Sequence, residues 1–136
     1  MTIHDYLEEC ILLLTVSSVV ERFQVVKKRE FETDGYLRVR AILVDDGLVE
    51  VSMYCQHVED AVHLAGYRFH WQDKEGILIK RWDNAKHHPE LGTFPNHVHL
   101  GDDKDTKASA TIDLRGVLEV LESEVGIQKN RIQKND

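Results

Sequence analysis

Residues 66–100 read GYRFHWQDKEGILIKRWDNAKHHPELGTFPNHVHL, and this stretch decides the fold of the chain. It holds both tryptophans, both prolines and five of the eight histidines. Its first half predicts a β-hairpin with strands over 62–72 and 77–82, joined by a polar turn that contains glycine. A loop over 83–96 follows and returns into a short extended segment over 97–100. The stretch therefore predicts an antiparallel sheet with one long loop at its edge.

The two strands of the hairpin alternate, so the hairpin has two unlike faces. We expect Trp71 to lie opposite Leu78 and Tyr67 to lie opposite Trp82, which makes one face aromatic and apolar. The opposite face then carries the polar and aliphatic residues of both strands, namely Arg68, His70, Gln72, Ile77, Ile79 and Arg81.

The residues before the hairpin predict a short helix and a three-stranded meander. Thr2 can cap a helix over 2–15, whose apolar residues recur at helical spacing. Strands over 19–31, 36–44 and 48–55 follow, separated by two turns that each contain an Asp-Gly pair. Turns placed this often favour antiparallel strands over a long helix.

The residues after the hairpin predict a linker and one more helix. Residues 101–110 are polar and small, as in a solvated linker. Asp113 can cap a helix over 114–125 with four apolar residues on one face, and Gly126 is expected to end it.

The composition is that of one globular domain. The chain has 136 residues, of which 42% are hydrophobic and 30% are charged. We predict a single α+β domain over 1–126, in which an antiparallel sheet of about five to six strands is flanked by an N-terminal and a C-terminal helix. A polar, frayed tail is expected over 127–136. Because such a sheet has open edges, we also expect a homodimer.

Cysteine usage and charge limit where the chain works and what it binds. Cys10 and Cys55 show neither metal-site spacing nor a disulfide framework, which predicts a reduced, cytoplasmic setting. The acidic N-terminal segment does not resemble a signal peptide, and no run reaches the length of a membrane span. The net charge of −7 disfavours broad electrostatic binding to nucleic acid, although it is compatible with a local basic patch.

The first candidate site is a metal-independent site for nucleic acid on the polar face of the hairpin. His70 can act as a general acid or base, and Arg68 and Arg81 can hold a phosphate. The commoner alternative is that these arginines are solvated or paired on a sheet face and that the aromatic residues pack in the core. The supporting residues are Lys80, Lys86, His87 and His88 for positive charge, and Tyr67, Trp82 or Phe94 for stacking a base.

Two further candidates involve histidines and the loop. His97 and His99 alternate on a strand, so with His87 or His88 they can form a site for a divalent metal such as Zn²⁺. Histidines on the surface or in packing contacts are the commoner explanation of this spacing. Asp83 and Asn84 follow the hairpin directly, where such residues most often form an Asx turn and less often supply a catalytic carboxylate.

The same stretch carries a family motif. The matching residues are Tyr67 to Gln72, Gly76, Arg81 to Ala85, His87 to Pro89, Phe94-Pro95 and His97 to His99, and the stretch that contains them covers about 30 of the 136 residues. They resemble the TumE family of toxin components from prokaryotic toxin–antitoxin modules. Lys86 departs from the family pattern, which more often has proline there. The resemblance implies a small cytoplasmic protein that acts on RNA or translation and is neutralised by a helix-turn-helix antitoxin encoded beside it.

The residues and the resemblance together predict a toxin that acts on RNA as a metal-independent ribonuclease without a cofactor. In this reading His70 or His88 moves protons and Arg68 and Arg81 hold the scissile phosphate. The substrate-binding residues are then Tyr67, Trp82, Asp83, Asn84, Lys86 and His87, and the partners are the antitoxin, RNA or the ribosome, and no membrane. One alternative is a non-catalytic module whose 83–100 segment docks a partner protein. Another is a hydrolase with a divalent metal on His87, His97 and His99.

Overall fold

The computed structural model describes residues 1–84, 96–101, 106–108 and 110–134. In these residues seven strands form one antiparallel sheet in chain order, β1 to β7, so the predicted α+β class is confirmed. The elements are α1 (Ile3–Val16), β1 (Val20–Glu30), β2 (Asp34–Leu43), β3 (Leu48–Val58), β4 (Ala61–Gln72), β5 (Leu78–Asp83), β6 (His97–Leu100), β7 (Thr106–Ala108) and α2 (Leu114–Lys134).

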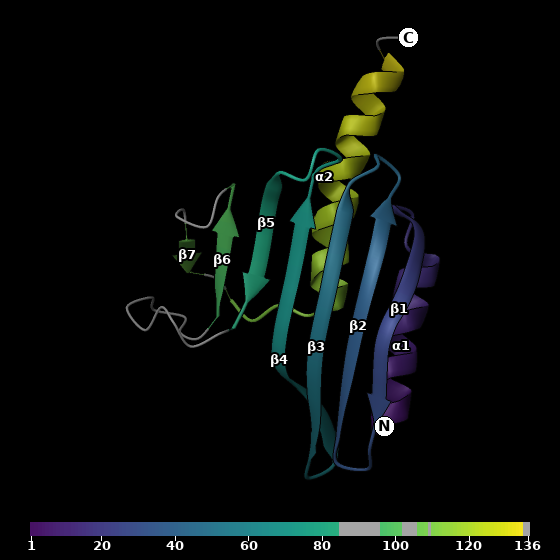
Figure 1. The fold of residues 1–136 in the computed structure, drawn as a ribbon, viewed down its shortest axis with the longest axis vertical. Coiled ribbons are helices and arrows are strands. Elements are labelled where there is room, and N and C mark those ends of the chain that lie inside the picture. The colour runs from purple at the N-terminus through teal and green to yellow at the C-terminus, as the bar shows by residue number, and fades with distance from the viewer. Residues whose placement is uncertain (85–95, 102–105, 109, 135–136) are drawn as a thin grey trace.

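Both helices cover the same face of the sheet (Figure 1). We call this the inner face and the opposite one the outer face. α1 lies against β1, β2 and β3. α2 presents a buried stripe at helical spacing, formed by Leu114, Val117, Leu118, Leu121 and Val125. The outer face is thus left to the polar residues of the alternating strands.

Helix α1 begins after the predicted cap residue, Thr2, which forms a capping box with Asp5. The hydroxyl of Thr2 accepts a hydrogen bond from the backbone N–H of Asp5 at 3.1 Å, and the carboxylate of Asp5 accepts one from the backbone N–H of Thr2 at 2.9 Å. The buried residues Ile3, Leu7, Cys10 and Leu14 form the face that packs on the sheet.

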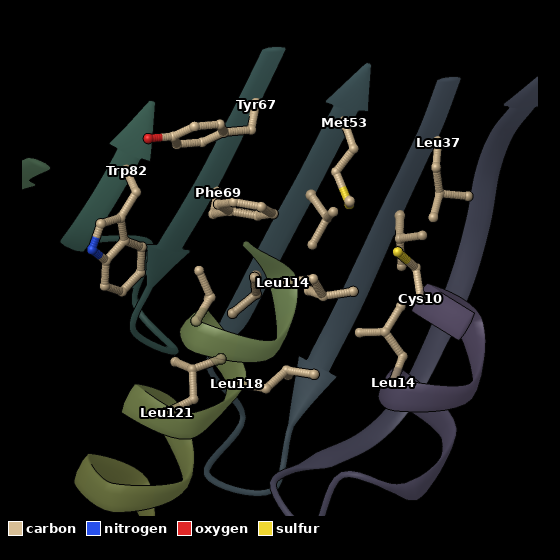
Figure 2. Close-up of a cluster of buried hydrophobic side chains, with 14 of the residues drawn as sticks. Cys10, Leu14, Leu37, Met53, Tyr67, Phe69, Trp82, Leu114, Leu118 and Leu121 are labelled. Atoms are coloured by element: carbon tan, nitrogen blue, oxygen red, sulfur yellow. The ribbon is translucent and has the colours of Figure 1, made fainter. Parts of the chain in front are cut away.

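The aromatic residues of the hairpin lie in the core beneath α2. Figure 2 shows Tyr67 and Phe69 of β4 and Trp82 of β5 on the same side of the sheet as the leucines of α2. All three aromatic residues are buried. A fully buried large apolar side chain contributes roughly 1.5–3 kcal/mol, so this cluster holds α2 against the sheet.

The hairpin has the predicted faces but a different pairing. Trp82 pairs with Phe69, two residues from the predicted partner Tyr67, and Trp71 pairs with Lys80. The register shifts where the pairing passes from Trp71 to Gln72, at the turn end of the hairpin. A shift of two residues keeps every side chain on its face, so Arg68, His70 and Arg81 share the outer face as predicted.

The C-terminal part differs from the prediction in two ways. Strand β7 lies inside the predicted linker. Its polar composition does not predict a strand, but pairing with β6 stabilises the extended conformation. α2 continues to Lys134, so Gly126 lies within the helix instead of ending it. Glycine inside a helix costs about 1 kcal/mol relative to alanine, which the packing of the preceding turns can offset. The division into a domain over 1–126 and a frayed tail over 127–136 stays a prediction.

Within the described residues, neither helix is long and apolar enough to cross a membrane.

Candidate functional site

The polar residues of the outer face form two rows that cross the strands. Cross-strand partners share a face, and the two rows are separated by two residues, or about 7 Å, along β2 to β6 and by three residues along β1, which has a bulge there. The first row is Lys27, Arg38, Ser52, Arg68, Asp83 and His97. The second row is Gln24, Arg40, Glu50, His70, Arg81 and His99.

The three residues predicted to handle a phosphate are brought together by this register. Arg68 and His70 are two residues apart on β4, and Arg81 is the partner of His70 on β5. His70 is partly exposed, and its Nε2 lies 3.0 Å from the side-chain oxygen of Gln72, which holds the ring at the surface. Arg68 and His70 face a hollow of about 280 Å³, which Arg38, Glu50, Ser52 and Gln72 also line, whereas Arg81 is not part of its lining.

Beside this hollow lies a buried charged cluster, which we call the Asp83 cluster and define as Arg81, Asp83, His97 and His99. The carboxylate of Asp83 lies 2.6 Å from Nε2 of His97 and 3.3 Å from Nε2 of His99. Nε of Arg81 lies 3.5 Å from the same carboxylate. The side chains of Asp83, His97 and His99 are at most 6% exposed, so their interactions act in a medium that screens charge poorly.

The sequence does not predict that Asp83 meets the two histidines. Asp83 ends β5, and His97 opposite it begins the four-residue strand β6. Two features of the sequence indicate part of this cluster: the alternation of His97 and His99, and the position of Asp83 at the end of a strand. The three residues are brought together by the pairing of β5 with β6, two strands that are far apart in the chain and whose pairing no local motif predicts.

The same three residues can hold a metal ion. One ligand atom each from Asp83, His97 and His99 lies within 4.8 Å of the others. Two imidazoles and one carboxylate are a ligand set that Zn²⁺ and Fe²⁺ accept. The metal site predicted with His87 as third ligand cannot be compared, because His87 lies outside the described residues.

The two aromatic residues predicted to stack a base belong to the core. Tyr67 is 6% exposed, its ring stacks on Phe69 at 5.4 Å, and its hydroxyl donates to the side-chain oxygen of Asn96 at 2.8 Å. Burial raises the pKa of the Tyr67 hydroxyl, in keeping with that position. Trp82 is 5% exposed on the same inner face. A base cannot reach either ring, so the stacking role predicted for them does not fit the structure.

Asn84 and Lys80 have structural partners. The side-chain oxygen of Asn84 accepts from the N–H of Tyr67, and its amide donates to the carbonyl of Ala65, both at 2.9 Å. Asn84 thus ties the end of β5 to β4. Lys80 points to the inner face, where it donates to Glu124 of α2 at 2.6 Å. The predicted site residues Lys86, His87, His88 and Phe94 lie outside the described residues.

These features define a one-sided α+β domain, with helices on one face of an antiparallel sheet and a histidine- and arginine-containing site on the other. A family model described as "Toxin TumE" matches residues 7–129, so the chain belongs to the TumE toxin family. This membership supports a role as a toxin with a cognate antitoxin as partner. No curated protein and no solved structure matches the chain.

Proposed function

We propose that this toxin acts on RNA as a metal-independent ribonuclease whose site is the outer face of β4 and β5. The observation that carries the proposal is that Arg68 and His70 line one hollow and that Arg81 is the register partner of His70 on β5. His70 is accessible and fixed by Gln72, as a proton-transfer group must be. Arg68 and Arg81 supply the positive charge that a reacting phosphate requires.

The proposed reaction uses the 2′-hydroxyl of RNA as the nucleophile. A general base takes the proton of this hydroxyl, and its oxygen attacks the neighbouring phosphorus. The bond from phosphorus to the 5′-oxygen breaks, and a general acid returns a proton to that oxygen. The products are a 2′,3′-cyclic phosphate and a 5′-hydroxyl, and the step needs neither a metal nor an external nucleophile. We assign one of the two proton transfers to His70 and propose His88 for the other.

The partners that we propose follow from the toxin role. A helix-turn-helix antitoxin would bind and neutralise the protein, and RNA, free or on the ribosome, would be its target in the cytoplasm. Within the described residues β1 and β7 are the terminal strands of the sheet. Terminal strands present unpaired backbone groups, which supports a homodimer as a further proposal.

The test is digestion of RNA in excess EDTA by the wild type, His70→Ala and His63→Ala. His63 is an exposed histidine at the other end of β4, so it controls for the loss of one imidazole. We expect the wild type and His63→Ala to cleave in EDTA, and His70→Ala to be slower by about 10²- to 10⁴-fold. Equal rates for His70→Ala and the wild type would reject the assignment of His70. No cleavage by any of the three would favour a module that docks a partner protein.

A second candidate function, a metal-dependent hydrolase, is favoured by the grouping of Asp83, His97 and His99. In that case the metal would activate a water molecule. The nearby guanidinium of Arg81 counts against this, because it already neutralises part of the Asp83 charge. The metal-dependent alternative predicts stoichiometric Zn²⁺, Mn²⁺ or Fe²⁺ in the purified protein and loss of cleavage in EDTA, whereas the metal-independent site predicts neither.

A further inference from the structure

The outer face of the sheet is basic, although the net charge of the whole chain is negative. The strand register places seven cationic side chains on this face, against the three carboxylates of Asp34, Glu50 and Asp83. The cations are Arg22, Lys27, Arg29, Arg38, Arg40, Arg68 and Arg81. The chain as a whole carries −7, so positive charge is concentrated on the face that also holds the proposed site.

Several of these cations are not neutralised by neighbours. Among the residues that the structure describes, Arg22, Arg38 and Arg68 have no carboxylate within ion-pair distance. Arg40 pairs with Glu50 at 3.0 Å, and the side chain of Arg40 remains 55% exposed. Uncompensated guanidinium groups on a sheet face favour binding of a polyanion.

The hollows of the outer face connect the proposed site with β1. The hollow at His70 shares Arg38 and Glu50 with a second hollow of about 240 Å³. The second shares Gln24 and Arg40 with a third of about 230 Å³, which Arg22 also lines. From β4 to β1 this path crosses three strand spacings, or about 14 Å. A path of this length can accommodate a short stretch of an extended chain.

A pair of tyrosines, one partly buried and one exposed, borders this path. Tyr36 of β2 and Tyr54 of β3 are register partners on the outer face, directly beside Arg38 and Ser52. Tyr54 is 37% exposed, and its hydroxyl donates to Asp34 at 2.8 Å. Its partner on β4 is Gly66, which adds no side chain next to the ring. Lys27 lies over the ring of Tyr36, with Nζ 5.7 Å from its centre.

We infer that the outer face of β1, β2 and β3 is a binding platform for single-stranded RNA. The backbone phosphates contact Arg22, Arg38 and Arg40 along the connected hollows, and a base stacks on Tyr54. Cationic grooves combined with exposed aromatic rings on a sheet are the usual means of binding single strands. The inference deepens the proposed function, because the platform leads the strand to His70. It also supplies the aromatic contact that Tyr67 and Trp82 cannot make.

The test measures binding without cleavage. The probe is a fluorescent single-stranded oligonucleotide of roughly 12 nucleotides with 2′-O-methyl sugars. Methylation removes the 2′-hydroxyl that would attack the phosphate, so the probe is bound without being cleaved. Its fluorescence anisotropy gives the affinity. We titrate it between about 50 and 200 mM salt. In a plot of the logarithm of the binding constant against the logarithm of the salt concentration, each lost phosphate contact should make the slope shallower by about 0.7. The double variant R22Q/R38Q should therefore have a slope that is shallower by about 1.4. The control K74Q/R115Q removes the same charge from a turn and from α2, and should bind as the wild type does.

The aromatic contact has its own pair of variants. Tyr54→Leu should bind roughly 5- to 100-fold more weakly with an unchanged salt dependence, because a stacked base is lost but no phosphate contact is. Tyr54→Phe keeps the ring and should bind normally. Equal affinity of Tyr54→Leu and Tyr54→Phe, or an unchanged salt dependence in R22Q/R38Q, would overturn the inference.

The outcomes separate this inference from the proposed function. A wild type that cleaves RNA while the platform variants bind normally would reject the platform and keep the ribonuclease. Platform variants that lose binding, in a protein that cleaves no RNA, would keep the platform and reject the ribonuclease. If the platform variants bind the oligonucleotide normally but no longer bind the antitoxin, the face is a protein interface and the inference fails.

Discussion

His70 on β4 and Arg81 on β5 are register partners on the outer face of the sheet. Directly opposed residues of antiparallel strands have Cα atoms about 4.5–5.5 Å apart. The imidazole and the guanidinium therefore arise from neighbouring backbone positions and can act on the same phosphate. Arg81 also contacts Asp83, so the register partner of His70 belongs to the Asp83 cluster.

Arg81→Lys tests whether the planar guanidinium matters and not only its charge. Lysine keeps the positive charge but lacks the fork that binds phosphate through two parallel hydrogen bonds. We expect kcat/KM for RNA cleavage to fall by about 10- to 100-fold, with kcat affected more than KM. Arg115→Lys on α2 is the matched control. Full activity of Arg81→Lys would show that Arg81 acts as a point charge only.

Asp83→Asn tests the buried cluster through stability. Removing the carboxylate takes away the negative charge that lies beside Nε of Arg81 and beside Nε2 of His97 and of His99, and breaking a buried ion pair costs about 3–5 kcal/mol. Glu50→Gln removes one partner of an exposed ion pair and should cost at most about 1 kcal/mol. Urea unfolding measures both. Similar, small losses for the two variants would mean that the cluster adds little to the stability of the fold.

Leu121→Ala tests how much the docking of α2 contributes. Leu121 is fully buried against the sheet, so the variant should lose about 2–5 kcal/mol of unfolding free energy. Leu12→Ala is the control, because Leu12 is 58% exposed on α1 and its loss should change stability by less than about 0.5 kcal/mol. A loss near zero for Leu121→Ala would contradict the packing of α2 in Figure 2.

Because the Cys10 thiol is buried, we expect the protein to lose stability in alkaline solution. Burial raises the pKa of this thiol from 9.0 to about 12, and Cys55 and Glu9 add to the shift. The unfolded chain therefore releases this proton at lower pH than the folded chain does, and the free energy of unfolding falls as the pH rises from about 9 towards 12. Unfolding measured at several pH values should show a shallower decline for Cys10→Ala. An equal decline in both proteins would contradict the burial of the thiol.

Reaction with a thiol reagent tests the same burial by kinetics. Thiol reagents attack the thiolate, which a raised pKa suppresses. In the folded protein at about pH 8, Cys10 and Cys55 should react far more slowly than a free thiol, and both should react in urea. Rapid reaction of Cys10 in the folded state would place α1 away from the sheet.

Alternation within single strands made the faces of the hairpin predictable. A period of two assigns Arg68, His70 and Arg81 to one face, and no error of two residues in the pairing changes that assignment. The same parity places Tyr67 and Trp82 opposite the arginines. Their position on the inner face therefore follows from the alternation, although their residue types also suit the stacking of a base.

What sequence reasoning missed depends on contacts between distant segments. The Asp83 cluster requires β5 to pair with β6, and β7 exists only as a partner of β6. The basic outer face can be recognised only once the register of β1 to β4 is known, because the net charge of the whole chain is −7. Neither a local motif nor the composition carries this information.

The central claim is that RNA is cleaved by its own 2′-hydroxyl without a metal, and the chemical ends of the products test it most directly. RNA digested by the wild type in EDTA should end in 2′,3′-cyclic phosphate and begin with 5′-hydroxyl, and His70→Ala should yield little of either. Products with 3′-hydroxyl and 5′-phosphate ends that form only without EDTA would contradict the account. They would move the chemistry to a metal held by Asp83, His97 and His99.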